Sequence, residues 1–148
     1  MSSNYNSSAL VKVTNNSGGN AEITLSHRYS SDPVQSLTWK VGPGQITTPP
    51  LSVGFNTGFM RTGKDYWWIG IRVLDGPAAG YYASRGSADD PSKECTLESA
   101  DNGKTLTFSV DTSNFVIQQV SGSCSTGMQK KTAEEATLVE VSDEKTRN

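Results

Sequence analysis

The segment DYWWIGIRVL at positions 65 to 74 constrains the fold most, because it is the most apolar stretch of the chain and alternates with a period of two. On an extended backbone, successive side chains point to opposite faces. One face then carries the apolar residues Trp67, Ile69, Ile71 and Val73. The other carries Tyr66, Trp68, Gly70 and Arg72. The segment is therefore predicted to be a central strand whose first face packs in a core.

Short runs of the same kind recur along the chain, at positions 9–14, 21–29, 35–41, 81–84, 94–99, 104–111 and 114–121. NNSGG at 15–19 and DNGK at 101–104 hold the Asn and Gly residues that tight turns need, so each predicts a hairpin. Consecutive prolines at 49 and 50 predict an edge strand or a bent connection over 45–53. The fold class predicted is all-β, an antiparallel β-sandwich of about 8–10 short strands.

The chain of 148 residues suits one domain. We expect an N-terminal arm at 1–8, the sandwich at 9–124, and a charged C-terminal tail at 125–148 that lacks aromatics and is disordered or docks on a partner. Within that tail, ATLVEV at 136–141 could form a short helix or add a strand to a neighbour's edge. Neither a signal-peptide pattern nor a membrane-spanning window is readable, which predicts a cytoplasmic location.

Charge and ligand counts exclude several classes of function. The formal net charge of -2 predicts no nucleic-acid partner. One histidine and two cysteines are too few for a zinc finger, a zinc hydrolase centre or an iron-sulfur cluster. Cys95 and Cys124 lack a C-x-x-C spacing, and the missing signal peptide favours free thiols. The alternative is one disulfide that ties the last strands together, which an oxidising compartment would favour.

His27 is the sole imidazole, so any histidine chemistry must use it. A Ser26, His27 and Asp32 arrangement can be drawn, but Ser26 and His27 point to opposite faces of their strand. The chain also has no G-x-S-x-G elbow to present another serine. We expect a buried histidine beside Tyr29, with no catalytic residue, no cofactor and no metal ligand assigned; a hydrolase centred on His27 is the competing hypothesis.

Asp89 and Asp90, with Glu94 and Glu98, form the densest acidic cluster before the tail. Carboxylates and loop carbonyls can hold calcium, but the spacing of an EF-hand loop is absent. A solvated loop is the interpretation favoured here, with a weak calcium site as its alternative.

The outward face of residues 65–74 is the candidate interaction surface. If Trp67 points inward, Trp68 points outward beside Tyr66 and Arg72, and Tyr81 and Tyr82 could extend the patch. Tryptophan, tyrosine and arginine are typical of protein interfaces, sugar-stacking platforms and membrane-interface belts. In the alternative, loops or the C-terminal tail cover Trp68 and make it part of a satellite core.

Four ordered blocks carry a resemblance to a known family: VTNNSGGNAEITLSHRYSSDPVQSLTW at 13–39, PGQITTPPLSV at 43–53, GKDYWWIGI at 63–71 and KECTLESADNGKTLTFSV at 93–110. Together the stretch from about Leu10 to Cys124 resembles the PUD domain family, named for proteins up-regulated in long-lived Daf-two nematode mutants. The resemblance implies a compact β-sandwich that pairs with a like subunit, and no catalytic activity comes with it. The architecture alone is similar to that of the aegerolysins, which recognise membrane lipids.

These observations predict a non-catalytic interaction module, not an enzyme, that self-associates or pairs with a similar subunit. There are two alternatives. The first is an aegerolysin-like protein that binds lipids or membranes, and one form of this hypothesis makes it cytolytic. The second is a carbohydrate-binding module.

Overall fold

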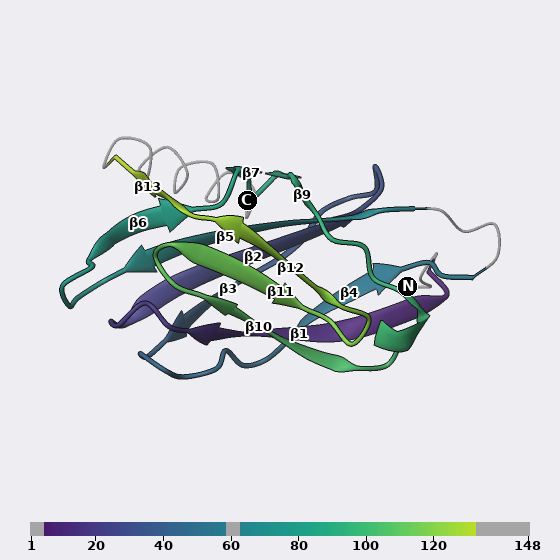
Figure 1. The fold of residues 1–148 in the computed structure, drawn as a ribbon, viewed down its shortest axis with the longest axis horizontal. Coiled ribbons are helices and arrows are strands. Elements are labelled where there is room, and N and C mark those ends of the chain that lie inside the picture. The colour runs from purple at the N-terminus through teal and green to yellow at the C-terminus, as the bar shows by residue number, and fades with distance from the viewer. Residues whose placement is uncertain (1–4, 59–62, 133–148) are drawn as a thin grey trace.

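Two β-sheets pack face to face in the computed structural model, which describes residues 5–58 and 63–132 (Figure 1). Sheet A has the order β12-β11-β10-β1-β4. Its strands are β1 (Ser7–Asn15), β4 (Leu51–Phe55), β10 (Thr105–Val110), β11 (Asn114–Gln118) and β12 (Ser123–Gly127). Sheet B has the order β13-β6-β5-β2-β3, with β9 also paired to β5. Its strands are β2 (Ala21–Tyr29), β3 (Gln35–Val41), β5 (Asp65–Val73), β6 (Gly80–Ala83), β9 (Lys93–Glu94) and β13 (Gln129–Lys131).

The predicted fold class is confirmed. The strand ladders are antiparallel except for β1 and β10, which run parallel. A small hairpin of β7 (Gly86–Ser87) and β8 (Asp90–Pro91) forms a ladder of its own, separate from the hydrogen bonds of the two sheets. No helix in the described ranges is long and apolar enough to cross a membrane.

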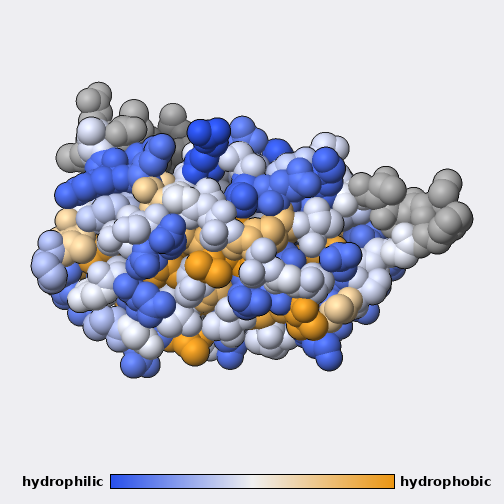
Figure 2. All heavy atoms as spheres, in the orientation of Figure 1, coloured by the Kyte–Doolittle hydropathy of each residue, from blue (hydrophilic) through white to orange (hydrophobic). Residues whose placement is uncertain are grey.

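The core between the sheets contains the apolar face of β5, as the period of two predicts. Trp67, Ile69 and Ile71 are fully buried there, and Val73 is nearly so. The Trp67 ring meets Phe108 of β10 edge to face, with ring centroids 4.9 Å apart. Burial of this aromatic pair removes a large apolar area from water, so it contributes strongly to holding the two sheets together. On the face drawn in Figure 2, hydrophilic side chains predominate and apolar ones show in smaller areas.

The predicted hairpin at NNSGG is wrong, because β1 belongs to sheet A and β2 to sheet B. The turn carries the chain from one layer to the other. Asn15, fully buried, holds this crossing: its Nδ2 donates to the carbonyl oxygens of Gly19 at 2.9 Å and of Val41 at 3.1 Å. Asn20 then ties the turn to the end of β5, and hydrogen bonds from its side chain and backbone hold the pKa of Asp75 below its ordinary value.

The predicted hairpin at DNGK is also wrong. Residues 99–101 form a short 3-10 helix, η1 (Ser99–Asp101), and the strand expected at 94–99 shrinks to β9. The buried Asp101 carboxylate accepts hydrogen bonds from the backbone N–H of Glu98 and Val120 and from the Ser121 hydroxyl. These bonds draw the segment toward the β11–β12 turn, so it cannot pair with β10.

Both predicted domain boundaries need correction. The arm assigned to 1–8 overlaps β1, whose first residues Ser7 and Ser8 pair with Phe55 and Gly54 of β4. The tail assigned to 125–148 begins too early, because β12 ends at Gly127 and β13 follows at Gln129. This one stretch of chain pairs first with β11 of sheet A and then with β6 of sheet B. The rest of the predicted tail, including ATLVEV, lies outside the described residues.

Candidate functional site

The predicted interaction surface lies on the outer face of sheet B. Tyr66, Trp68 and Arg72 share that face, and Tyr81 of β6 joins them because it stands opposite Arg72. Tyr82 does not, since it stands opposite the core residue Ile71 and belongs to the main core. Its assignment to the surface was wrong, because consecutive residues of one strand point to opposite faces.

Trp68 is covered, so the surface is not an exposed aromatic platform. Only 2% of Trp68 is accessible, and it forms a small cluster with Tyr81 and Ala83, against which Ala88 packs. Ala88 lies in the turn of the β7–β8 hairpin. The prediction of an exposed Trp68 was therefore wrong, and the alternative of a satellite core under a loop is confirmed.

Exposed ion pairs and cation–π contacts surround the covered tryptophan. Arg28 contacts Asp90 of the hairpin at 3.3 Å, and its guanidinium carbon is 5.8 Å from the centre of the Tyr66 ring. The guanidinium carbon of Arg72 likewise lies 5.3 Å from the centre of the Tyr81 ring. Each such contact at a partly exposed site is worth less than about 1 kcal/mol, so the hairpin is held by burial of Trp68 more than by charge.

Two buried donors on this face have no acceptor among the described residues, Trp68 Nε1 and Arg28 Nε. Ser26 stands opposite Trp68, and Arg28 is two residues along β2 on the same face. A buried N–H that lacks an acceptor costs about 1–3 kcal/mol.

Gly70 makes room for the Trp68 ring. A Cβ at this position would overlap the indole of Trp68 and the hydroxyl of Tyr81. We therefore predict that Gly70→Ala lowers the free energy of unfolding by about 1–3 kcal/mol, through overpacking. Denaturant unfolding measures the loss. The control is Ser52→Ala, at an exposed position of β4. Gly58→Ala is not a suitable control, because Gly58 has a positive φ. An unchanged midpoint for Gly70→Ala would show that the ring is free to move away.

His27 lies inside the sandwich, as predicted, and takes part in a buried polar network. Its Nδ1 donates to Gln35 Oε1 at 2.8 Å, since that oxygen already accepts the Gly54 N–H, and its Nε2 lies 2.6 Å from Asp65 Oδ1. The second carboxylate oxygen of Asp65 accepts the Leu97 N–H at 2.9 Å. His27 and Asp65 are both fully buried, so no substrate reaches them from the surface of this structure.

The serine and aspartate drawn beside His27 are not its partners. Ser26 points to the outer face, where its hydroxyl lies 3.0 Å from that of Ser36. The carboxylate at His27 is Asp65, 38 positions further along the chain, and Asp32 instead accepts a hydrogen bond from Tyr5. Burial and that bond to Asp32 raise the pKa of Tyr5 to about 12. No local pattern indicates the His27–Asp65 pair, because β2 and β5 are distant in sequence.

The acidic residues at 89–98 do not gather into one site. Asp90 pairs with Arg28, and Glu94 lies 3.6 Å from Lys64. Within residues 5–58 and 63–132, no three His, Cys, Asp or Glu side chains lie together as metal ligands would. The calcium alternative therefore gains no support.

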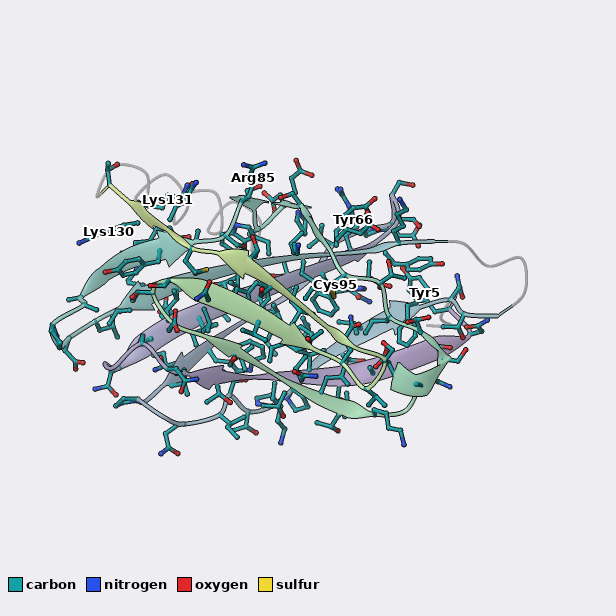
Figure 3. All side chains as sticks on the ribbon, viewed as in Figure 1. Tyr5, Tyr66, Arg85, Cys95, Lys130 and Lys131 are labelled. Carbon is teal, nitrogen blue, oxygen red and sulfur yellow. A yellow bond between two sulfur atoms is a disulfide. The ribbon has the colours of Figure 1, made fainter. Side chains whose placement is uncertain are left out.

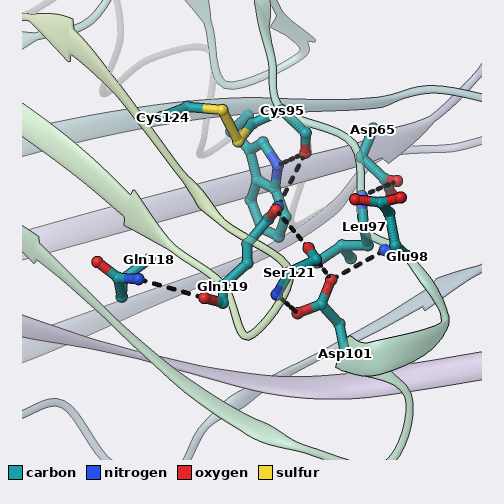
Figure 4. The surroundings of a disulfide bond; sticks show 10 residues. Asp65, Cys95, Leu97, Glu98, Asp101, Gln118, Gln119, Ser121 and Cys124 are labelled. Carbon is teal, nitrogen blue, oxygen red and sulfur yellow. Dashed lines mark hydrogen bonds between the residues drawn. A yellow bond between two sulfur atoms is a disulfide. The ribbon is translucent and has the colours of Figure 1, made fainter.

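Cys95 and Cys124 form a disulfide, with Cα atoms 6.1 Å apart (Figure 4). The preference for free thiols was wrong, because β12 runs along the edge of sheet A beside the segment that follows β9. The Cys95 carbonyl accepts hydrogen bonds from Trp67 Nε1 at 2.9 Å and from Gln119 Nε2 at 3.1 Å. The bridge thus anchors a non-strand segment over the core.

A cationic groove at the edge of sheet B was missed by the sequence analysis. Lys130 and Lys131 lie on β13, which pairs with β6 at the edge of sheet B (Figure 3). Arg72 and Tyr81 line the same groove. The two lysines were assigned to the tail, where charged residues indicate solvation. The signal that could have identified the two lysines as part of a strand is an alternation of apolar and polar residues. This alternation continues only weakly past Cys124, and a short edge strand does not need to show it.

Comparison with known proteins finds one family model that matches the N-terminal part of the chain. The family model described as "Up-Regulated in long-lived daf-2" matches residues 5–74, which include β1 to β5. The match contains the blocks at 13–39, 43–53 and 63–71, whereas the block at 93–110 lies beyond it. No curated protein matches the chain. The match confirms, over residues 5–74, the resemblance to the PUD family.

Proposed function

We propose that the chain is a non-catalytic interaction module that pairs with a like subunit through the open edge of β3. The observation that carries this proposal is the edge itself. β3 has 7 residues, Gln35–Val41, and is the last strand of sheet B. Among the described residues its backbone ladder runs to β2 alone. An edge strand with unpaired N–H and C=O groups is a template for pairing with another chain.

The features that usually protect an edge are few on β3. The strand contains no proline and one charged residue, Lys40. Its outer face is flat and hydroxyl-rich, since Thr38 Oγ1 lies 2.8 Å from Thr24 Oγ1 and Ser36 pairs in the same way with Ser26. By contrast, β13 at the opposite edge has 3 residues, two of them lysines. β3 is therefore the edge best suited to extend sheet B into a second subunit.

The burial of His27 supports a non-catalytic role, because the sole imidazole of the chain is fully enclosed and bonded at both nitrogens. The carbohydrate-binding alternative depends on the exposed aromatic patch, and its tryptophan, Trp68, is covered. We therefore propose no second function.

A charge-complementation experiment tests the pairing edge. Full overlap of two antiparallel copies of the 7-residue strand places the central residue, Thr38, opposite its own copy. Like charges at directly opposed positions are destabilising, and opposite charges are favourable. We predict that the wild type elutes as a dimer, that Thr38→Lys and Thr38→Glu each raise the dimer dissociation constant about fivefold or more, and that their mixture pairs again. Size-exclusion chromatography with light scattering measures the mass.

The matched control is Thr107→Lys, an exposed position on β10 inside sheet A, where no edge is open. This variant should remain a dimer. A wild-type protein that is monomeric at micromolar concentration, or a mixture of the two Thr38 variants that stays monomeric, would overturn the proposal. An interface of on the order of 1,200–2,000 Å² is expected for a stable pair.

The cytoplasmic location stays a prediction, and the disulfide argues for a different one. Structural disulfides persist in oxidising compartments and are rare in the cytosol. We infer that the folded protein resides in, or passes through, an oxidising compartment. Alkylation of the protein in freshly lysed cells of its source measures this: protected Cys95 and Cys124 support the inference, and labelled thiols contradict it.

A further inference from the structure

The β7–β8 hairpin is a very small element that covers part of the outer face of sheet B. Each of its strands has 2 residues. Among the described strands, the two pair with each other alone, through Gly86 with Pro91 and Ser87 with Asp90. An isolated two-stranded hairpin is marginally stable in water. The closed position of this hairpin therefore depends on its contacts with the sheet beneath it.

Two kinds of contact hold the hairpin on the sheet. The first is apolar: Ala88 packs against Trp68, and Pro91 is buried. The second is the ion pair between Arg28 of β2 and Asp90, at 3.3 Å. The side chains of this pair are 27% and 75% exposed, respectively. An ion pair this close to water contributes little and is weakened further by salt.

Closure of the hairpin also has a cost, because two donors are buried beneath it. Trp68 is 2% exposed, and neither its Nε1 nor the Nε of Arg28 has an acceptor among the described residues. The two side chains are diagonal neighbours on the outer face, since Ser26 stands opposite Trp68 and Arg28 opposite Tyr66. A buried N–H without an acceptor is unfavourable relative to a hydrated one. The unpaired donors therefore offset part of the free energy gained by covering the ring.

The other two tryptophans of the chain differ in this respect. Trp67 Nε1 donates to the Cys95 carbonyl at 2.9 Å, and Trp39 Nε1 donates to the Pro49 carbonyl at 2.6 Å. Trp67 lies in the main core between the sheets, whereas Trp68 belongs to the small outer cluster. The indole N–H of Trp67 therefore meets water only when the sandwich itself opens. That of Trp68 meets water as soon as the hairpin moves.

We propose that the β7–β8 hairpin is a lid, latched by the Arg28–Asp90 ion pair, that opens in the folded protein and uncovers Trp68. In the open state both unpaired donors are hydrated, and Tyr66 and Trp68 present an aromatic face beside the Arg28 guanidinium. The lid thus controls access to the outer face of sheet B. The proposal does not depend on the β3 pairing edge, because the hairpin contacts β2 and β5.

Hydrogen exchange of the indole N–H groups, followed by NMR on the full-length protein, tests the lid. We predict that the Trp68 indole N–H exchanges at least about tenfold faster than that of Trp67, since local opening precedes global unfolding. Trp68→Phe identifies the resonance. Asp90→Asn removes the latch and should speed exchange at Trp68 by about two- to fivefold, the range expected for one exposed ion pair. It should leave Trp67 unchanged. High salt should act in the same way on the wild type and have no such effect on Asp90→Asn.

The matched control is Asp89→Asn, which removes the same charge from the same turn. Asp89 takes part in no ion pair within the part of the chain that the structure describes, so exchange at Trp68 should stay as in the wild type. Exchange at Trp68 no faster than at Trp67 would overturn the proposal. So would equal effects of Asp89→Asn and Asp90→Asn, because the ion pair would then not be the latch. Equal acceleration at Trp67 and Trp68 in Asp90→Asn would also overturn it, since the whole sandwich would then be opening.

Discussion

Replacing Asp65 by alanine is expected to lower the free energy of unfolding by about 2–6 kcal/mol, since two buried polar groups each lose a hydrogen-bond partner at a cost of about 1–3 kcal/mol. Asp65 is fully buried, and its carboxylate accepts the Leu97 N–H and contacts His27 Nε2 at 2.6 Å. Without the carboxylate, the histidine ring and a backbone N–H lose their acceptor in the interior. Guanidinium unfolding followed by tryptophan fluorescence measures the loss.

A double-mutant cycle isolates the His27–Asp65 contact from other effects. His27→Gln and Asp65→Asn are each expected to destabilise, and their combination should cost clearly less than the sum, with a coupling of about 0.5–3 kcal/mol. Asp111→Ala is a matched control, since Asp111 accepts two backbone N–H groups in an exposed turn. Additive effects of the His27 and Asp65 substitutions would contradict the role of the buried pair. So would an Asp65→Ala variant that loses no more free energy of unfolding than Asp111→Ala.

Removal of the disulfide is expected to cost about 3–4 kcal/mol, from the loop-entropy relation for a closed loop of this size. Cys95 and Cys124 are 29 positions apart and join the segment after β9 to β12. Opening the bridge gives the unfolded chain more freedom, while the hydrogen bonds at the Cys95 carbonyl hold the folded segment only partly. The variant carrying Cys95→Ala and Cys124→Ala should unfold at a lower denaturant concentration than the wild type.

Reductant supplies the control for this second experiment. It should lower the stability of the wild type toward that of the double variant and leave the double variant unchanged. If the reduced and oxidised wild type unfold at the same denaturant concentration, the bridge contributes nothing to stability and the assignment of a structural role to it is wrong.

The inward face of β5 could be predicted because it rests on local geometry. Trp67, Ile69, Ile71 and Val73 alternate, and an extended backbone sends them to one side whatever the strand pairs with. The same argument correctly separated Ser26 from His27 and Trp67 from Trp68. The same period places Tyr81 and Tyr82 on opposite faces of β6, so the prediction that both extend the outer patch was wrong for Tyr82.

The covering of Trp68 could not be predicted, since it depends on the path of a connection. The strand pattern shows that the ring leaves the main core, but the β7–β8 hairpin decides whether it meets water. The turns show the same division. Gly18 and Gly103 both adopt the positive φ that their motifs predict. Yet one turn crosses between sheets and the other follows a 3-10 helix, because buried side chains of Asn15 and Asp101 fix where the chain goes.

The amino-acid pattern is enough to predict the all-β class, the alternation of each main strand and the inward side of β5, because these follow from contacts between residues near one another in the chain. The choice of neighbouring strands emerges only in the folded molecule, and with it the His27–Asp65 pair, the Cys95–Cys124 bridge and the cationic groove of Arg72 and Lys130. These sites join residues from separate strands. Their energies depend on burial and distance in space, and no local pattern along the chain records either quantity.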